Sequence, residues 1–419
     1  MVNTRSSPAY LSLARLFSRR RILIGLALIG SILVQFSVAW KLREQIATGI
    51  TDFSGLYTGG KIVASGNGGN LYDLATQARV EAAFTVRGHS TGILTFTPHA
   101  PLEALFFAPL TAFPYSTAAW IWWVCNLLLA YLVLFLLRLH LPSLNTRLDL
   151  AILGMGCFLP LLAAECQGQN SVLTLLLFTV CFINLARGRA WMAGSALALT
   201  TYKPQLALVM IVILAITSER RWRILTGFLQ TCIGVVALSV ALVGWRTYAA
   251  YLGVVCSFAA GFDDAKSRTN LMPNLRGLIY DISGSRLSHP AFVLLVGVIS
   301  VLFVLAVLWA SGGKRGTTQE MHLQFALAVT VTQIVSYHGF LHDMTVLLLP
   351  LYLVWDSLAE TGLHTWNRRF LAAIVLLLFF FRLFVPVSGF PFDACASIAF
   401  FVLLCWELRT AGGPASAIA

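Results

Sequence analysis

The sequence predicts an all-α, polytopic membrane protein, and two observations support this fold class. Of the 419 residues, 58% are hydrophobic and only 11% are charged. Runs such as RILIGLALIGSILVQFSVAW and LTGFLQTCIGVVALSVALVG approach the ~20 apolar residues that a helix needs to cross a bilayer. Because such runs recur almost to the C-terminal end, we expect about twelve transmembrane helices.

The basic residues give these helices a direction. The net charge is +12, and Lys and Arg cluster at the ends of the apolar runs. This is the positive-inside pattern, which places such clusters in the cytoplasm. No long basic run with interleaved aromatic residues remains, so nucleic acid is not an expected partner. The clusters are Arg19 to Arg21, Arg138 with Arg147, Arg187 with Arg189, Arg220 with Arg221 and Arg223, Lys314 with Arg315, and Arg368 with Arg369.

The first apolar run, over 22–40, follows basic residues and has no small-residue cleavage site, so we expect a retained helix rather than a signal peptide. It leads into a long outer segment over 41–115, and a second outer segment is expected over 245–290. The other spans are expected near 116–138, 148–165, 171–187, 190–202, 205–218, 223–244, 291–310, 321–338, 343–358, 368–385 and 394–408.

This pattern gives a basic cytoplasmic N-terminus over 1–21, one transmembrane domain over 22–408 and a cytoplasmic tail over 409–419. The short pair of runs over 190–218 is broken at Lys203-Pro204, so a hairpin that does not fully cross is an alternative. The eight cysteines are scattered. Cys166, Cys256 and Cys395 fall near predicted outer ends, but no paired spacing supports a disulfide.

The outer segments contain three stretches that predict short interfacial helices. Residues 70–84 have helical spacing, which places Leu71, Leu74, Ala78 and Ala82 on one stripe. Residues 97–114 are apolar but too short and too proline-bounded to span a bilayer. Residues 273–282 form the third stretch.

The stretch TDFSGLYTGGKIVASG, over 51–66, contains the frame of a phosphate-binding loop in Gly55, Gly60 and Lys61. That motif needs Ser or Thr after the lysine, but Ile62 follows. We therefore expect the glycines to permit close helix packing. Asp52 precedes the predicted helix. Its carboxylate either caps that helix or serves as a general base at the outer face, and the two roles are compatible.

Three further stretches bring polar groups to predicted span ends. In ECQGQNS, the amides of Gln167, Gln169 and Asn170 suit sugar hydroxyls, although a polar turn between helices is the alternative. Lys203 interrupts an apolar hairpin, at a cost of about 2.5–3.5 kcal/mol for a lysine at mid-membrane. It either neutralises a lipid phosphate or extends to the lipid headgroups.

In SYHGFLHDM, His338 and His342 are four residues apart and Asp343 follows. On one helix the two imidazoles would form a metal-binding pair, but no third ligand is evident. A catalytic or sugar-binding role for His338 or Asp343 is the favoured interpretation. Arg276 and Arg382 either bind phosphate or meet lipid headgroups, and the sequence does not separate these roles.

Together these stretches resemble, in order, the motifs of glycosyltransferase family 87 across about residues 20–385. Two positions depart from the pattern: Tyr337 stands where the family has a proline, and His342 where it has a tyrosine. The prolines around His99 are also spaced differently. The matching stretches are DFSGLYTGGKIVASGNGGNLYD, TFTPHAPLEALFFAPLTAFP, QGQNSVLTLLL, RGRAWMAGSALALTTYKPQLALV and SYHGFLHDMTVLLLP.

The resemblance implies a GT-C type glycosyltransferase of the bacterial cytoplasmic membrane, similar to α-mannosyltransferases that use polyprenyl-phosphate-mannose. The donor would carry its lipid tail in the bilayer and its hexose, mannose in the best-known case, outside. The acceptor would be a glycolipid or polysaccharide. Because the donor is a lipid, neither a nucleotide site nor a cofactor or metal is implied.

The resemblance also implies an inverting mechanism. Asp52 would deprotonate the acceptor hydroxyl, and His338 would share this role or bind the donor phosphate. Lys203 and Arg276 would stabilise the departing phosphate, whose charge calls for cations. The implied sugar- or acceptor-binding residues are Tyr57, Gln167, Gln169, Asn170 and Asp343.

Two other classes of function share many spans. A transporter or flippase of polyprenyl-linked sugars would suit the broken helix at Lys203, but its polar groups would lie near the midplane. A polymerase or ligase of cell-surface polysaccharide would carry its large outer loop late in the chain. Here the polar groups fall at outer ends, and the longer outer segment follows the first span, so the transferase is preferred.

Overall fold

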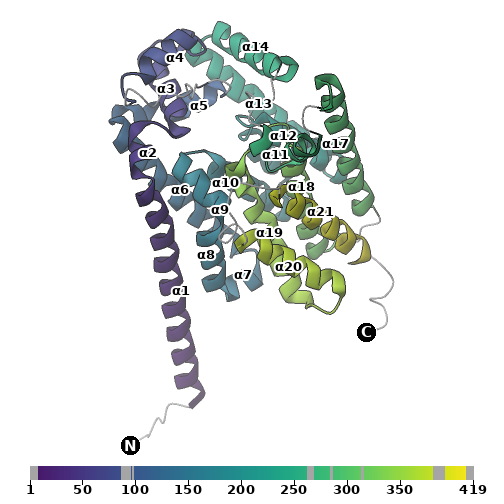
Figure 1. Ribbon diagram of the computed structural model, residues 1–419. Coiled ribbons are helices and arrows are strands. Elements are labelled where there is room, and N and C mark those ends of the chain that lie inside the picture. Colours follow the sequence, from purple (N-terminus) through teal and green to yellow (C-terminus); the bar gives the residue numbers. More distant parts are fainter. Residues whose placement is uncertain are drawn as a thin grey trace, which may run out of the picture.

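The computed structural model describes residues 8–85, 96, 99–261, 269–283, 286–312, 316–380 and 392–411. Within these ranges the chain is helical and contains no strand (Figure 1). The all-α fold class is therefore confirmed for the described part. Arg382 lies outside these ranges.

The helices of the first half are α1 Pro8–Lys41, α2 Arg43–Thr48, α3 Phe53–Ala64, η1 Gly68–Asn70, α4 Leu74–Glu81, α5 Pro101–Phe107, η2 Ala108–Ala112, α6 Tyr115–Leu137, α7 Pro142–Thr146, α8 Leu148–Cys157, α9 Leu159–Gln167, α10 Ser171–Ala186 and α11 Ala190–Ala198. Those of the second half are α12 Pro204–Thr217, α13 Arg221–Val243, α14 Trp245–Gly261, η3 Thr269–Leu271, α16 Leu275–Ser283, α17 His289–Ser311, α18 Thr318–Val335, η5 Leu341–Leu347, α19 Leu348–Thr361, α20 Trp366–Phe380 and α21 Phe392–Ala411.

Five described helices are long and apolar enough to cross a membrane. They lie at Arg19–Lys41, Tyr115–Leu137, Arg221–Val243, His289–Ser311 and Leu341–Thr361. The number rises to six if the bent pair α8 and α9 counts as one span, so the twelve predicted spans are not confirmed. Several predicted spans are helices too short to cross alone, such as α10 and α12.

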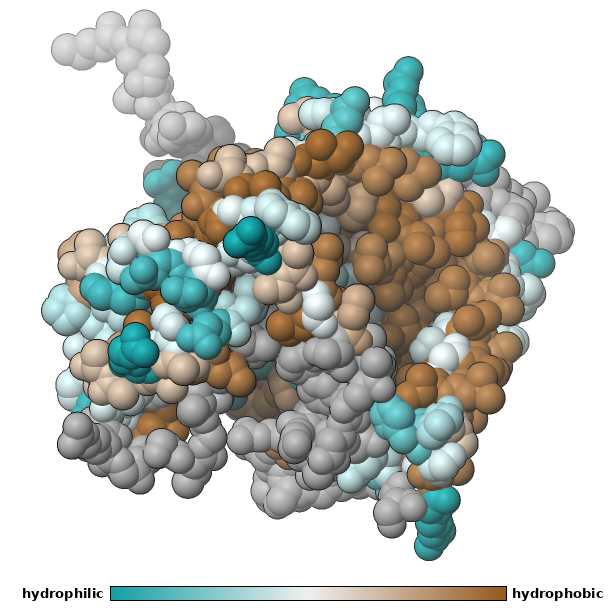
Figure 2. All heavy atoms as spheres, turned by 90° about the horizontal axis from the view of Figure 1, so that it is seen from above, coloured by the Kyte–Doolittle hydropathy of each residue, from teal (hydrophilic) through white to brown (hydrophobic). Residues whose placement is uncertain are grey.

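Apolar side chains remain exposed along the long helices, as expected for surfaces that face lipid. Figure 2 looks down on the upper end of the molecule and shows apolar side chains lining a hollow beside more polar patches. The exposed set includes Leu26 and Leu33 on α1, Leu229 and Leu242 on α13, and Leu294, Val301 and Leu305 on α17.

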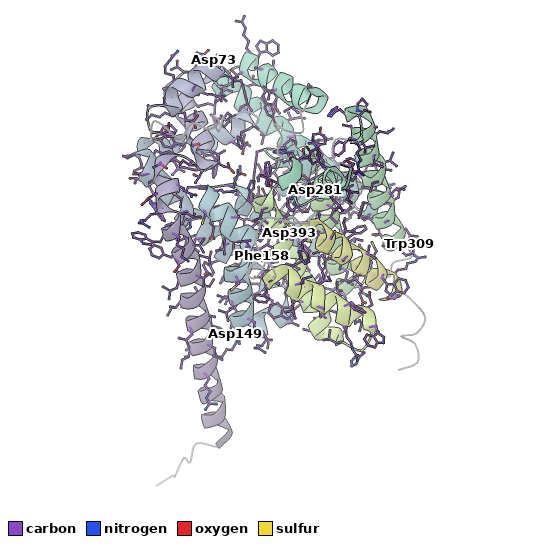
Figure 3. The ribbon with its side chains drawn as sticks, in the orientation of Figure 1. Asp73, Asp149, Phe158, Asp281, Trp309 and Asp393 are labelled. Atoms are coloured by element: carbon purple, nitrogen blue, oxygen red, sulfur yellow. The ribbon has the colours of Figure 1, made fainter. Side chains whose placement is uncertain are left out.

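The bend between α8 and α9 turns the chain by 57° at Phe158. Pro160 follows in the first turn of α9, where its missing N–H costs no helical hydrogen bond. Phe158 is buried and meets Phe379 edge-on, with ring centroids 5.7 Å apart. Figure 3 shows it between Asp73, in the upper part of the molecule, and Asp149 below. The bend therefore lies inside the bundle and aims α9 at the upper end.

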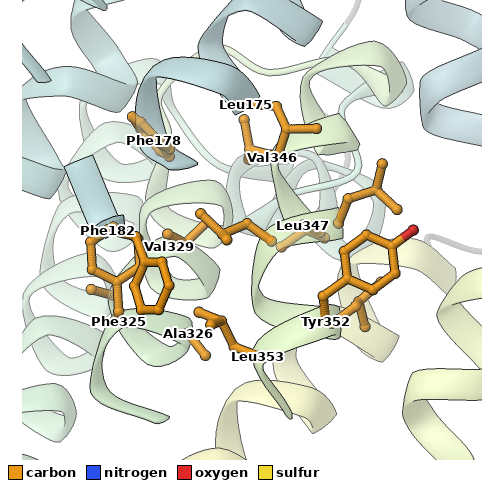
Figure 4. Close-up of a cluster of buried hydrophobic side chains, with 14 of the residues drawn as sticks. Leu175, Phe178, Phe182, Phe325, Ala326, Val329, Val346, Leu347, Tyr352 and Leu353 are labelled. Carbon is orange, nitrogen blue, oxygen red and sulfur yellow. The ribbon is translucent and has the colours of Figure 1, made fainter. Parts of the chain in front are cut away.

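The main core joins α10, α18, η5 and α19 (Figure 4). Lipid tails are as apolar as these side chains, so the cluster stabilises the bundle through close van der Waals packing between its helices. The Tyr352 hydroxyl also donates to the Ala151 carbonyl at 2.9 Å, which ties α19 to α8. This core fixes the start of α10 relative to η5. Its labelled members are Leu175, Phe178, Phe182, Phe325, Ala326, Val329, Val346, Leu347, Tyr352 and Leu353.

An upper layer, made of α3, α4, α5, η2 and α14, covers the end of the bundle away from the N-terminal end of α1 (Figure 1). The three predicted short helices are confirmed as α4, α5 with η2, and α16. The predicted stripe on α4 is wrong, because Leu74 is exposed while Gln77 and Glu81 are buried. Gln77 binds the Leu71 carbonyl, and Glu81 accepts from Ser54, so polar pairing decides which face turns inward.

The glycines of the possible phosphate loop lie inside α3 and serve packing, as predicted. A Cβ on Gly60 would come within 2.9 Å of the Phe107 backbone, and one on Gly59 within 2.2 Å of the Phe96 ring. A helical segment cannot wrap a phosphate as a glycine-rich loop does, so the phosphate-loop interpretation fails.

We expect Gly60→Ala to lower the free energy of unfolding by about 1–3 kcal/mol, because the added methyl group forces α3 away from α5. The thermal unfolding midpoint in detergent measures this loss. Gly69→Ala is the control, since a Cβ there meets nothing within 4 Å. Equal midpoints for the two variants would contradict close packing at Gly60.

Candidate active site

A five-residue turn over 167–171, between α9 and α10, is the centre of a polar site beneath the upper layer. Gly168 permits the turn with φ +66°, and a Cβ there would lie 2.6 Å from the Cβ of Phe53. Its carbonyl accepts from the Trp122 indole at 2.9 Å. The four other side chains of the turn each contact a different partner, so the turn joins segments that are distant in sequence.

Asp52 occupies the N-cap position of α3, but its carboxylate does not cap the helix. Instead Oδ2 accepts from Gln169 Nε2 at 2.7 Å. The Gln169 carbonyl is held in turn by Asn126 at 3.2 Å. The predicted capping interaction is therefore absent, and Asp52 is half-buried with its carboxylate oriented by an amide.

Asn170 contacts Glu103, which is paired with His99, and neither of these two residues was predicted as a site residue from the sequence. Its amide donates to Glu103, which is 3% exposed. His99 Nδ1 lies 3.1 and 3.0 Å from the two Glu103 oxygens, and the Ala100 N–H donates to the same carboxylate at 3.0 Å. The sequence did contain a signal for this pair: a histidine and a glutamate four residues apart, beside a proline that begins a helix.

Ser171 opens a second group of charges. Lys203 forms a buried ion pair with Asp343 and donates to Ser171 at 2.7 Å. The Asp343 carboxylate also accepts from Ser171 at 3.1 Å and from the Phe340 N–H at 3.0 Å. Lys203 is 7% exposed, so the interpretation that it extends to the headgroups is wrong. The predicted helix break at Lys203-Pro204 is confirmed, because α12 begins at Pro204.

His338 and His342 do not share an α-helix, because residues 336–340 are irregular and η5 begins at Leu341. The premise of the metal pair is therefore wrong. His342 instead contacts Gln167 at 2.7 Å and Asp343 at 3.4 Å. Among the described residues no three His, Cys, Asp or Glu side chains are grouped to hold a metal.

His338 lies in the segment that joins α18 to η5. Its ring meets Phe340 edge-on, and its carbonyl accepts from Gln205 at 3.2 Å. Burial lowers the pKa of His338 to about 4; Asp343 acts against this shift, and the charge of Arg276 adds to it. The imidazole is consequently neutral at pH 7, which suits proton acceptance better than charge pairing with a phosphate.

Arg276, on α16, braces the same segment. Its guanidinium lies 4.2 Å from the Tyr337 ring and donates to the Tyr337 carbonyl at 3.3 Å. Asn274 donates to the Ser336 carbonyl at 2.8 Å. Arg276 is 1% exposed, so it does not reach the lipid headgroups. Its contacts hold the segment that contains Tyr337.

Tyr57 is the one predicted site residue that the structure places among apolar packing. Its hydroxyl donates to the Phe113 carbonyl at 2.9 Å, and its ring packs against Phe84 and Tyr115. Within the described residues, its hydroxyl forms no hydrogen bond with the polar side chains of the 167–171 turn. The eight cysteines are unpaired, so no disulfide constrains this end of the molecule.

The polar site is thus built from Asp52, His99, Glu103, Gln167, Gln169, Asn170, Ser171, Lys203, His342 and Asp343. It combines an oriented carboxylate, a histidine–carboxylate pair and a buried ion pair on rigid helix ends. Such a set can accept a proton at one point and stabilise anionic charge at another.

The model of glycosyltransferase family 87 matches residues 96–337, which is more than half of the chain. The match begins in the segment before His99 and ends in the segment that Arg276 braces. No curated protein and no solved structure matches the chain.

Proposed function

The chain belongs to glycosyltransferase family 87, and from this premise we propose that it transfers a hexose from a polyprenyl-phosphate sugar to a glycolipid or polysaccharide acceptor. Mannose is the first candidate sugar. The proposal rests chiefly on one observation, the half-buried Asp52 carboxylate that Gln169 orients beside a cluster of charged side chains.

In the proposed reaction Asp52 accepts the proton of the acceptor hydroxyl. The acceptor oxygen forms a bond to the anomeric carbon, while the bond from that carbon to the phosphate oxygen breaks. The lipid phosphate leaves with the bonding electron pair, and the configuration inverts. General base catalysis of this kind typically contributes about 10²–10⁴ in rate.

The departing phosphate needs positive charge rather than a strong acid. Lys203 and Arg276 are the proposed sources. The Lys203 ammonium donates to Ser171 and to Asp343, and that aspartate balances its charge. Arg276 supports the 336–338 segment, so its influence on a bound phosphate would pass largely through that segment and His338.

The sugar hydroxyls are proposed to meet the amides of the 167–171 turn. Gln167 and Gln169 are held by His342 and Asp52, and Asn170 by Glu103, so their amides are preorganised. Asp343 and His338 complete the proposed sugar- or acceptor-binding set at the other side of the turn. Tyr57 is proposed to act by supporting α3, which carries Asp52 at its start.

The apolar exterior of the molecule suits the lipid part of the proposed donor. The apolar hollow of Figure 2 opens on the same end of the molecule as the upper layer. A polyprenyl tail would bury apolar surface there while its phosphate reached the polar site. We propose that this end faces the outside of the bacterial cytoplasmic membrane, consistent with Arg19 to Arg21 in the N-terminal half of α1, which points away from the upper layer.

The purified protein in nanodiscs, supplied with polyprenyl-phosphate-mannose labelled in the sugar and with host lipid extract, tests the function. We expect label to appear in a new glycolipid or polysaccharide. The same labelled lipid in proteoliposomes tests the flippase alternative. Movement of the donor between leaflets without transfer would replace the transferase by a flippase.

A further inference from the structure

Lys203 was the expected phosphate-binding cation, yet its charge is matched by Asp343 inside the same buried pair. The Lys203 ammonium already donates to Ser171 and Asp343, so most of its hydrogen-bond capacity is used within the protein. The polar site contains another group that can carry a positive charge, the imidazole of His99. Building on the proposed function, we propose that His99, held by Glu103, is a further catalytic residue that donates a hydrogen bond from Nε2 to the phosphate leaving group.

The geometry fixes one side of the ring. Both Glu103 oxygens lie within 3.1 Å of Nδ1, and Glu103 is itself held by Asn170 and the Ala100 N–H. The Tyr72 hydroxyl donates to the His99 carbonyl at 2.7 Å, which secures the backbone. No described residue forms a hydrogen bond with Nε2, so that nitrogen is available to a ligand.

Electrostatics favour the charged form of this imidazole. Burial alone would lower the pKa of His99, but the Glu103 carboxylate outweighs burial and raises the pKa above its ordinary value. The charges that act on His99 are those of Glu103, Lys203 and Asp52. Because Lys203 and Asp52 both act on His99, the imidazole lies within electrostatic range of the ion pair and of the proposed base. An oriented imidazolium is a stronger donor to phosphate than a neutral group.

The step balances without a further reactant. The bond from the anomeric carbon to the phosphate oxygen breaks, and the electron pair stays on the phosphate. The imidazolium N–H donates a hydrogen bond to that oxygen as its charge develops. Asp52 keeps the acceptor proton, so the two groups divide the charge separation between the two ends of the transferred sugar.

Direct binding of farnesyl phosphate tests the proposal without requiring turnover. We expect His99→Gln to weaken this binding roughly tenfold or more, as for loss of a charge-assisted hydrogen bond, and to leave farnesol binding unchanged. His289→Gln is the matched control, because His289 is exposed at the start of α17. Unfolding midpoints of all variants show whether each one folds.

Glu103→Gln supplies a readout that a structural role would not move. Without the carboxylate the pKa of His99 falls, so farnesyl phosphate binding should weaken at neutral pH and recover as the pH is lowered. In the wild type the imidazolium is present below its raised pKa and lost above it, so affinity should decline at alkaline pH. His99→Gln should abolish that decline.

Equal affinity of His99→Gln and wild type for farnesyl phosphate would overturn the role of His99 alone. If Lys203→Met loses affinity and His99→Gln does not, the role of His99 is also overturned, and Lys203 is the residue that binds the phosphate. Failure of the wild type to bind farnesyl phosphate at all would overturn both this role and the proposed class of donor.

Discussion

Asp52→Asn should reduce sugar transfer by about 10²–10⁴, the usual contribution of a general base. The asparagine retains an oxygen that accepts from Gln169 Nε2, so the 2.7 Å contact between the two chain segments can persist. It removes the one property that the proposed reaction needs, the ability to take up a proton. The expected result is therefore a folded protein that binds the donor and fails to transfer its sugar.

Transfer of labelled mannose from the polyprenyl-phosphate donor measures the effect, with the unfolding midpoint beside it. Glu44→Gln removes a carboxylate from the preceding helix, where the side chain is 85% exposed, and should leave transfer unchanged. If Asp52→Asn works at nearly the wild-type rate, the base is another group, and neutral His338 becomes the next candidate.

Lys203→Met should be the most destabilising single substitution in the site, at about 3–5 kcal/mol. It leaves the Asp343 charge buried, and the partners that remain to it among the described residues are the Ser171 hydroxyl, the Phe340 N–H and His342. Asp343→Asn should cost a similar amount, because it strands the ammonium. The double variant should cost less than the sum, because no unpaired charge then remains.

Thermal unfolding of the two single variants and the double variant gives this coupling directly. The pair of Arg147 and Asp149, 3.5 Å apart and with side chains 55% and 21% exposed, is the more exposed control. Its three variants should change the free energy of unfolding by only about 0–1 kcal/mol. A coupling between Lys203 and Asp343 as small as that of the control would show that the buried pair contributes no special stability.

The sequence predicted those features that depend on local pattern. Hydropathy located most helices, the proline located the break beside Lys203, and the polar run ECQGQNS located the central turn. The steric argument for the glycines of α3 was confirmed by the close approach of the Phe107 backbone to Gly60. Each of these predictions was made from a pattern of residues that are neighbours in the chain, even where its confirmation came from a distant contact.

Features that depend on distant partners were missed. Lys203 and Asp343 are 140 positions apart, and Gln169 and Asp52 are 117 apart, so only packing reveals either pair. Glu103 is a mixed case, because it pairs with its neighbours His99 and Ala100 but also with Asn170, which is 67 positions away. The stripe on α4 failed because hydrophobic spacing could not anticipate that Gln77 would find two backbone partners.

The 167–171 turn has a consequence for biosynthesis. It joins Asp52 and Glu103, which leave the ribosome early, to Asp343, which leaves it late. Until the segment carrying Asp343 is inserted, the lysine of the pair is unneutralised and the turn lacks one of its anchors. The proposed site is therefore complete only when insertion of the bundle is nearly finished.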